Sequence, residues 1–169
     1  HKITDKGICR TFQNIRLFSQ MTVLENVLVG GHCRSKSGVF SSVFRTKSQR
    51  NEEESTHKVA TELLQLVGLS SYEDVIAENL AYGQQRRLEI ARALASNPSL
   101  LLLDEPAAGM NETETENLFD LIKQVQQRGI TVLVIEHDMP FVMKLCDRIA
   151  ELNFGKKLAE GTPEEIQNN

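Results

Sequence analysis

The feature that most constrains the fold is a run of four leucines that ends in two acids. Leu100–Leu103 contains no polar residue, and Asp104–Pro106 (Asp-Glu-Pro) follows it directly. A second apolar run, Ile130–Ile135, lies one helix length further on and includes a single threonine. Strands without polar alternation are typical of parallel sheets that helices cover on both faces. The pattern therefore predicts an α/β fold in which both strands are buried on both faces.

Hydrophobic periodicity predicts the remaining elements. Helices are expected over Glu52–Val67, Gln84–Ala95, Glu112–Gln127, Pro140–Leu145 and after Thr162. A short strand is expected over Gly7–Phe12, and a hairpin over Ile149–Asn153 and Lys157–Ala159. The segment Thr22–Val29 is ambiguous between helix and strand. Arg34 to Arg50 carries five basic residues and no acid, which favours a loop.

Charge, hydropathy and cysteine content exclude several classes of protein. The 169 residues have a net charge of −4, which leaves no basic footprint for nucleic acid. No apolar run approaches the roughly 20 residues that span a bilayer, so work at a membrane would require a partner. Three separated cysteines without a CxxC pair suggest neither zinc nor a disulfide framework, and favour a reducing cytoplasm. The chain starts at His1 and not at Met, and we expect a further segment upstream.

The adjacent acids Asp104 and Glu105 are the strongest candidates for chemistry. They follow a buried strand, and the carboxyl edge of an open α/β sheet is where ligands bind. At such an edge the first acid can help to hold Mg²⁺, and the second can polarise an attacking water. Taken alone, the pair favours the plainer explanation of a solvated acidic turn.

Three further sites become informative only in combination. Leu80–Gln84 is a small-residue turn before a helix, where open backbone N–H groups suit an anion such as phosphate. His137 follows the second apolar strand, and Gln13 follows the first short strand. Each has an ordinary structural explanation when it stands alone: a helix entry, a structural histidine and an unremarkable polar residue.

The order of these elements resembles the nucleotide-binding subunit of the ATP-binding cassette family. Phe12-Gln13, Leu80–Gln85, Leu103–Pro106 and Glu136–Asp138 match its Q-loop, signature motif, Walker B motif with catalytic glutamate, and switch histidine. Ala107–Asn111 falls where the family has its D-loop. The signature is a variant, Leu-Ala-Tyr-Gly-Gln. With Asn14–Phe18 it is similar to ATP-binding subunits of high-affinity branched-chain amino-acid importers. Ala81 lacks the hydroxyl that a serine there would offer to the γ-phosphate, so that contact is expected to be weaker or differently placed.

The resemblance implies a fold and a set of residue roles. The fold is a P-loop NTPase-like parallel sheet flanked by helices, with a helical subdomain, and residues 1–169 form part of one nucleotide-binding domain. Residues 14–79 would run from the Q-loop through the helical subdomain, and residues 80–169 would carry the other motifs and a C-terminal segment. Asp104 and Gln13 would serve the metal, and Glu105 and His137 the catalysis. The nucleotide-binding residues would be Gln13, Leu80, Ala81, Tyr82, Gly83, Gln84 and His137, and the D-loop Ala108, Gly109, Met110 and Asn111.

The same resemblance implies cofactors, partners and location. ATP and Mg²⁺ would be bound, at the cytoplasmic face of the cell membrane, by a peripheral protein. The partners would be a second ATP-binding subunit, membrane permease subunits and, indirectly, a periplasmic or extracellular binding protein, with no nucleic acid. One alternative is a soluble cassette ATPase of DNA repair or translation, although neither a long coiled coil nor a second cassette is visible. Another alternative is a truncated, non-catalytic interaction module.

One element of the family is missing from the sequence. No G-x-x-x-x-G-K-[ST] phosphate loop occurs, and the nearest match, Gly30–Ser37, has Ser35 in its second glycine position. That match also follows Gln13, whereas the phosphate loop of the family precedes the Q-loop. We therefore expect the phosphate loop and the first strands upstream of His1. Residues 1–169 alone are expected to be inactive and marginally stable.

Overall fold

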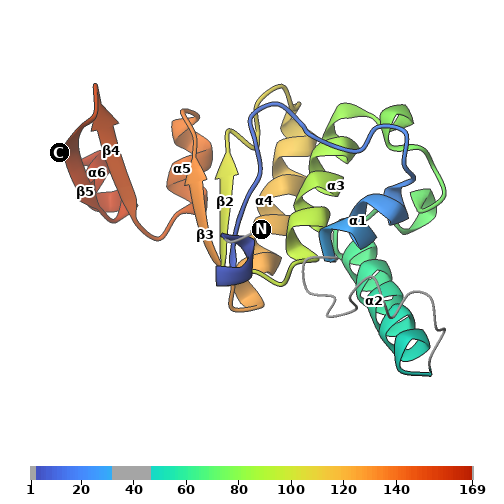
Figure 1. The fold of residues 1–169 in the computed structure, drawn as a ribbon. Helices are drawn as coiled ribbons and strands as arrows, with labels where there is room; N and C mark the ends of the chain where they lie inside the picture. Colours follow the sequence, from blue (N-terminus) through green and yellow to red (C-terminus); the bar gives the residue numbers. More distant parts are fainter. Residues whose placement is uncertain (1–2, 32–46, 169) are drawn as a thin grey trace. The chain divides into compact units, whose positions relative to one another are not determined.

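A computed structural model describes residues 3–31 and 47–168 of the chain, with side chains described from residue 54 onward in the second range (Figure 1). The described residues divide into two compact units, the first ending at Ile135 and the second beginning at Glu136.

The first unit is built on a parallel sheet. Its strands β1 (Ile8–Arg10), β2 (Leu100–Asp104) and β3 (Thr131–Ile135) are ordered β1-β2-β3, with both neighbouring pairs parallel. The register pairs Arg10 with Leu102 and Asp104 with Ile135. The predicted α/β fold with a parallel sheet is confirmed, and β2 is its central strand.

The helices of this unit lie beside the sheet (Figure 1). In chain order they are the 3₁₀ turn η1 (Thr4–Lys6), α1 (Val23–Gly31), α2 (Lys47–Leu66), the 3₁₀ turns η4 (Ser70–Tyr72) and η5 (Ala77–Asn79), α3 (Tyr82–Leu94) and α4 (Glu112–Gln127). Helix α3 contacts β1, α4 contacts β3, and α1 packs against both α2 and α3. The helices α1 to α3 therefore form a bundle that α3 joins to the sheet.

Local sequence explains where the longer helices begin and end. The Asn111 side chain accepts a hydrogen bond from the Glu114 N–H (3.0 Å), and the Glu114 carboxylate accepts one from the Asn111 N–H (3.1 Å). This capping box starts α4, and Gly129 ends it with a left-handed backbone (φ +80°). The buried stripe of α4 is Leu118, Leu121, Ile122 and Val125. In α2 the expected face is buried, and Gly68 (φ +67°) follows its end.

Two predictions along the α1–α2 region require comment. The ambiguous segment Thr22–Val29 is helical, and Val23 and Val27 are fully buried in α1. The loop predicted from Arg34 to Arg50 is wrong over its last four residues, because α2 already begins at Lys47. Lys47, Gln49 and Arg50, three of these four residues, are good helix formers in their own right. Residues 34–46 of the basic run lie outside the described residues.

The prediction that both apolar strands are buried on both faces is correct only in part. Leu101 and Leu103 of β2 are buried, whereas Leu133 and Ile135 of β3 are 46% and 50% exposed. The register places Leu133 beside Leu102, which is also only partly buried, so the open positions belong to one face of the sheet. Successive side chains of a strand point to opposite faces, so one face of β3 is left open in this chain.

The second unit contains α5 (Met139–Leu145), β4 (Ile149–Asn153), β5 (Lys156–Gly161) and α6 (Pro163–Gln167). The Asp138 side chain accepts a hydrogen bond from the Phe141 N–H (3.1 Å) and caps α5. Strands β4 and β5 form the predicted antiparallel hairpin around Phe154-Gly155, although β5 is longer than expected. No helix in the described parts of the chain is long and apolar enough to cross a membrane.

Candidate functional site

Strand β2 ends in the two acids that sequence reasoning selected. Asp104 pairs with Ile135 in the register of the sheet, and the Glu105 N–H donates to the Ile135 carbonyl (2.9 Å). Glu105 then leaves the sheet with a left-handed backbone (φ +43°), which is unusual for a residue other than glycine. Such a conformation costs on the order of 1–3 kcal/mol, and it persists where the surroundings enforce it, commonly at functional sites.

The Glu105 carboxylate is held by Gln13. The Gln13 Nε2 donates to Glu105 Oε2 at 2.7 Å, across 92 positions of sequence. Gln13 lies three residues beyond β1, and β1 is the parallel neighbour of β2. The two strands therefore deliver an amide and a carboxylate to the same edge of the sheet. Two residues that the motif order assigned to one site are thus in direct contact.

Asp104 has a cationic partner that sequence reasoning missed. Arg10, the last residue of β1, forms an ion pair with it (Nη2 to Oδ2, 2.8 Å). A basic residue at the end of the strand before Gln13 was the available signal, but without the register it could not be matched to an acid. Among the described residues, no cluster of three or more His, Cys, Asp or Glu side chains could hold a metal by itself.

The signature turn presents the N-terminus of α3. Ala81 occupies the N-cap position, and its N–H donates to Gln84 Oε1 (3.0 Å). Ala81 has no side-chain oxygen, so it cannot accept the reciprocal hydrogen bond from the Gln84 N–H. The Gln85 Nε2 fixes the entry to the helix by donating to the Leu80 carbonyl (2.9 Å). The first-turn amides of a helix have no intrahelical acceptor. These open amides are the feature on which the predicted anion binding of the turn depends, and that binding stays a prediction.

The expected D-loop residues lie against the signature turn. The Ala108 N–H donates to the Glu105 carbonyl (3.2 Å), so this turn begins on the second acid. Gly109 (φ +76°) faces the Tyr82 ring, and a Cβ there would lie 3.4 Å from Tyr82 Cε1. A Cβ at Gly83 would lie 2.5 Å from Glu114 Oε1, so only glycine fits that position without a shift of Glu114.

Met110 and Asn111 complete the predicted D-loop. The Met110 N–H donates to the Ala107 carbonyl (3.1 Å), which continues the turn. Asn111 caps α4, as described above. The predicted D-loop is therefore a short connection between the acid-bearing end of β2 and a capped helix.

A buried ion pair on α3 reaches the Gln13 segment, and sequence reasoning did not find it. Arg86 and Glu89 have side chains 0% and 2% exposed, and Arg86 Nη1 lies 2.9 Å from Glu89 Oε2. Arg86 also donates to the carbonyls of Phe12 and Gln13, both at 2.7 Å. The signal was a charged pair three residues apart on the apolar stretch that continues through Leu88, Ile90 and Ala91. Residues of these types are almost never fully buried unless they are paired.

His137, predicted as the switch histidine, belongs to the second unit. It lies between β3 and α5, its side chain is 75% exposed, and its Nδ1 is 3.9 Å from Glu136 Oε2. The Glu136 side chain is only 1% exposed and accepts a hydrogen bond from the His137 N–H (3.2 Å). The contact of His137 with a γ-phosphate stays a prediction.

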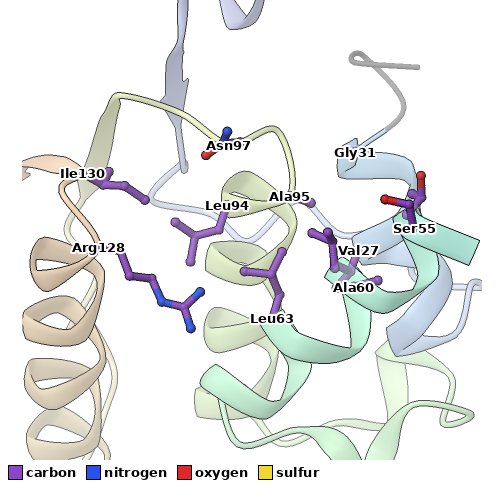
Figure 2. Close-up of a pocket in the computed structure, with 12 residues that line it drawn as sticks. Val27, Gly31, Ser55, Ala60, Leu63, Leu94, Ala95, Asn97, Arg128 and Ile130 are labelled. Atoms are coloured by element: carbon purple, nitrogen blue, oxygen red, sulfur yellow. The ribbon is translucent and has the colours of Figure 1, made fainter. Parts of the chain in front are cut away.

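The first unit also contains a cavity of about 460 Å³ away from the acids (Figure 2). Figure 2 shows Val27 of α1, Leu63 of α2 and Leu94 of α3 lining it, with Arg128 at one side. None of its described lining residues is a carboxylate or a histidine.

The nearest match to a phosphate loop begins close to this cavity, but its first glycines have another explanation. Gly30 and Gly31 belong to α1, and a Cβ at Gly30 would collide with the Arg92 carbonyl of α3. Gly30 therefore allows close helix packing. The rest of the match, residues 32–37, lies outside the described residues.

Comparison with known proteins identifies the family of the chain. The ABC transporter family model matches residues 1–108. The high-affinity branched-chain amino acid transport ATP-binding protein BraF of Pseudomonas aeruginosa is 46% identical over 170 residues, which cover 100% of this chain and 67% of that protein. The chain thus spans about two thirds of the length of this relative.

Solved structures agree with the family match. A crystal structure of an ATP-binding cassette in its ADP conformation superposes with a TM-score of 0.80 and 36% identity, over 99% of this chain and 65% of that one. A dimeric cassette in a post-hydrolysis state, bound to ADP and Pi, gives a TM-score of 0.76 and 29% identity, over 96% and 65%. With the ordered motifs and the acid-bearing parallel sheet, these matches show that the chain belongs to the ABC transporter family.

Proposed function

We propose that the complete protein hydrolyses ATP, with Glu105 as the group that polarises the attacking water. The observation that carries this proposal is the 2.7 Å contact between Gln13 Nε2 and Glu105 Oε2 at the end of the central strand. A carboxylate held by a fixed donor, on a backbone constrained at φ +43°, is pre-oriented toward the ligand edge of the sheet. His137 would contact the γ-phosphate from the segment after β3.

The donor set at this edge fits Mg²⁺, which prefers oxygen ligands and usually combines one or two carboxylates with substrate phosphates. Asp104 would supply the carboxylate, and Gln13 can offer its amide oxygen because its Nε2 is committed to Glu105. When bound, the ion would neutralise phosphate charge. Until then, the Arg10 guanidinium balances the Asp104 carboxylate, and this ion pair would have to open as the metal enters.

We further propose that the site is shared between two subunits. The signature turn Leu80–Gln84 presents backbone amides to an anion, and it would face the ATP held by a second copy or a homologous subunit. The solved dimeric cassette bound to ADP and Pi supports this arrangement. With Ala81 in the place of serine, the turn would rely on backbone N–H groups and on the space at Gly83. The phosphate loop that holds each ATP would come from the part of the protein that residues 1–169 do not include.

The transported substrate class follows from the relatives. BraF is a branched-chain amino acid transport protein, and we propose the same substrate class for an importer driven by this protein. The protein would lie at the cytoplasmic face of the membrane and dock on a permease, which receives substrate from a binding protein. Phe18 is a suitable contact: it is 46% exposed, and the buried Asn26 bonds both its N–H and its carbonyl (3.0 and 3.1 Å).

The hydrolysis proposal is tested by Glu105→Gln in the complete protein. Phosphate release should fall by orders of magnitude while ATP affinity stays nearly unchanged, since only the transition state loses stabilisation. Residues 1–169 alone should neither bind ATP tightly nor release phosphate. A variant that loses binding as strongly as turnover would assign Glu105 a structural or metal role instead.

The docking proposal is tested by Phe18→Ala in the reconstituted importer. Transport or assembly should fall while basal ATP hydrolysis survives, because interface hot spots are commonly a few apolar or aromatic anchors. Replacing Arg45, Lys47 and Arg50 together by Ser should matter much less. The opposite ranking would make the basic run the contact surface.

A further inference from the structure

We infer that Arg86, together with Glu89, is a positioning residue that sets the place of Gln13 relative to Glu105 and thereby the rate of hydrolysis. The inference rests on the proposed function for its kinetic part. Both residues bind the segment from Phe12 to Arg16, and through that segment they can act on Glu105. Arg86 Nη2 also lies 3.5 Å from the Tyr82 hydroxyl.

The contacts form a clamp on that segment. One guanidinium edge meets two successive backbone carbonyls, through Nη1 to Phe12 (2.7 Å) and Nη2 to Gln13 (2.7 Å). The Glu89 carboxylate binds Nη1 through Oε2 (2.9 Å) and accepts the Arg16 N–H on Oε1 (3.3 Å). Three residues of one loop are therefore tied to two neighbouring turns of α3.

The clamp supplies three hydrogen bonds to a segment whose side chains are mostly exposed. Phe12, Gln13 and Arg16 are exposed, and none belongs to a helix or strand. Arg16 also stacks over the Phe12 ring (4.7 Å to the centroid). Because Arg86 holds the Gln13 backbone on one side and Glu105 meets its side chain on the other, a displaced carbonyl would move the amide away from the carboxylate. Errors of about 1 Å in such groups can cost roughly 100-fold in rate.

Charge alone does not explain why an arginine is present. A buried ion pair often contributes no more stability than apolar residues of the same volume. Arginine, however, is a planar fork that can bind two acceptors at fixed spacing, and lysine is not. We therefore expect position 86 to require a side chain that donates two hydrogen bonds, one to each of two successive backbone carbonyls.

The adjacent residue provides a matched control. Arg87 is on the same helix and also donates to a backbone carbonyl, that of Val67 at 2.8 Å, but it contacts the end of α2 and not the Gln13 segment. Loss of Arg87 removes one surface-side carbonyl bond from α3. It leaves the Phe12–Arg16 segment with all its partners.

The test uses the complete protein with Arg86→Met and Glu89→Leu combined, so that no buried charge is left without a partner. Its melting temperature should stay close to the wild-type value. Hydrogen exchange at the Arg16 amide should accelerate at least about 10-fold as its acceptor is lost, and kcat should fall about 10- to 100-fold with KM for ATP nearly unchanged. The single variant Arg86→Lys should have a kcat between that of the double variant and that of the wild type. Arg87→Met should match the wild type in both measurements.

Two results would overturn the inference. One is wild-type kcat in the folded double variant. The other is Arg16 exchange that stays at the wild-type rate, since the clamp would then not hold the segment. If the double variant fails to fold, Arg86→Lys decides, because a kcat equal to that of the wild type would show that the two-carbonyl geometry is not needed. If the complete protein hydrolyses no ATP at all, the proposed function fails and the exchange measurement still decides whether the clamp places the segment.

Discussion

The parallel sheet of the first unit and the hairpin of the second unit are stabilised in different ways. In the sheet, Leu101 and Leu103 of the central strand are buried, and the acids stand at its end. In the hairpin, Leu152 is 69% exposed, and the ordered polar contacts are ion pairs between Arg148, Lys157 and Glu160. The sheet depends on apolar burial contributed by distant parts of the chain, whereas the hairpin depends on turn geometry and local charge.

This contrast indicates where function can be built. A carboxylate is held in one place only if its backbone is, and the buried β2 provides that support for Asp104 and Glu105. The hairpin offers no comparable support within the second unit, and among its described residues it presents none of the candidate site residues. Substitutions in the two regions should therefore differ in size and in kind.

The largest difference is expected between Leu103→Ala in β2 and Leu152→Ala in β4. Loss of the buried leucine should lower the free energy of unfolding of the complete protein by about 2–5 kcal/mol, because it leaves a cavity. Loss of the exposed one should cost under about 0.5 kcal/mol. Chemical denaturation measures both. An equal cost would show that Leu152 is covered in the complete protein, and the contrast would then be lost.

Glu105 should show that the sheet enforces an unfavourable backbone. Glu105→Gly and Glu105→Ala both remove the carboxylate and its bond to Gln13, but only alanine keeps a Cβ at φ +43°. Glycine avoids the cost of a left-handed backbone but loses more backbone entropy on folding. The net result should be a glycine variant that is more stable than the alanine variant by about 1 kcal/mol. Thermal melts of the two proteins provide the comparison. Equal stability, or a more stable alanine variant, would mean that the backbone is not strained there.

The hairpin should gain stability from a better turn. Phe154 and Gly155 both have positive φ (45° and 77°), the geometry of a two-residue turn that favours Asn-Gly. The Phe154 ring is 99% exposed, so little packing is lost with it. Phe154→Asn should therefore raise the unfolding free energy by about 0.5 kcal/mol, below the full cost of a left-handed residue. Destabilisation instead would indicate that the ring is bound by something in the complete protein.

The smallest effect concerns the charge of Glu160. A hydrogen bond from Lys157 lowers the pKa of Glu160, helped by the charge of Lys157 and by Arg148. A depressed carboxyl pKa contributes stability above the unfolded value, and this is lost as pH falls through the folded value. Carboxyl NMR titration should place Glu160 below its usual range, and Lys157→Met should raise that pKa more than Arg148→Met does. The reverse order would assign the larger influence to Arg148.

Local patterns were sufficient to predict most of the fold. The bounds of α4 follow from one capping box and one apolar stripe, and β2 from four leucines before an acid. The start of α2 was missed because the acid-free charge pattern was given more weight than helix propensity. The exposure of β3 was missed because burial depends on what covers each face of the sheet, and the sequence of the strand itself does not show this.

The candidate site was predicted residue by residue from the motif order, but its internal contacts were not. That Gln13 meets Glu105, and Arg10 meets Asp104, depends on the register of β1 and β2. The Arg86–Glu89 pair was missed because charged residues on a helix are normally expected at its surface. The contacts of Gln13 with Glu105 and with Arg86, and of Arg10 with Asp104, join positions more than 70 residues apart, and pattern analysis of one segment does not reveal them.

The most direct test of the account is a double-mutant cycle between Gln13 and Glu105 in the complete protein. Gln13→Ala and Glu105→Gln should each lower kcat for ATP hydrolysis. Gln13→Ala should cost a smaller factor in the Glu105→Gln background than in the wild type, because only its contribution to Mg²⁺ is left once there is no catalytic carboxylate to hold. Coupling of this kind is the result that the account predicts. Two losses that multiply would show that Gln13 and Glu105 act independently, and would contradict it.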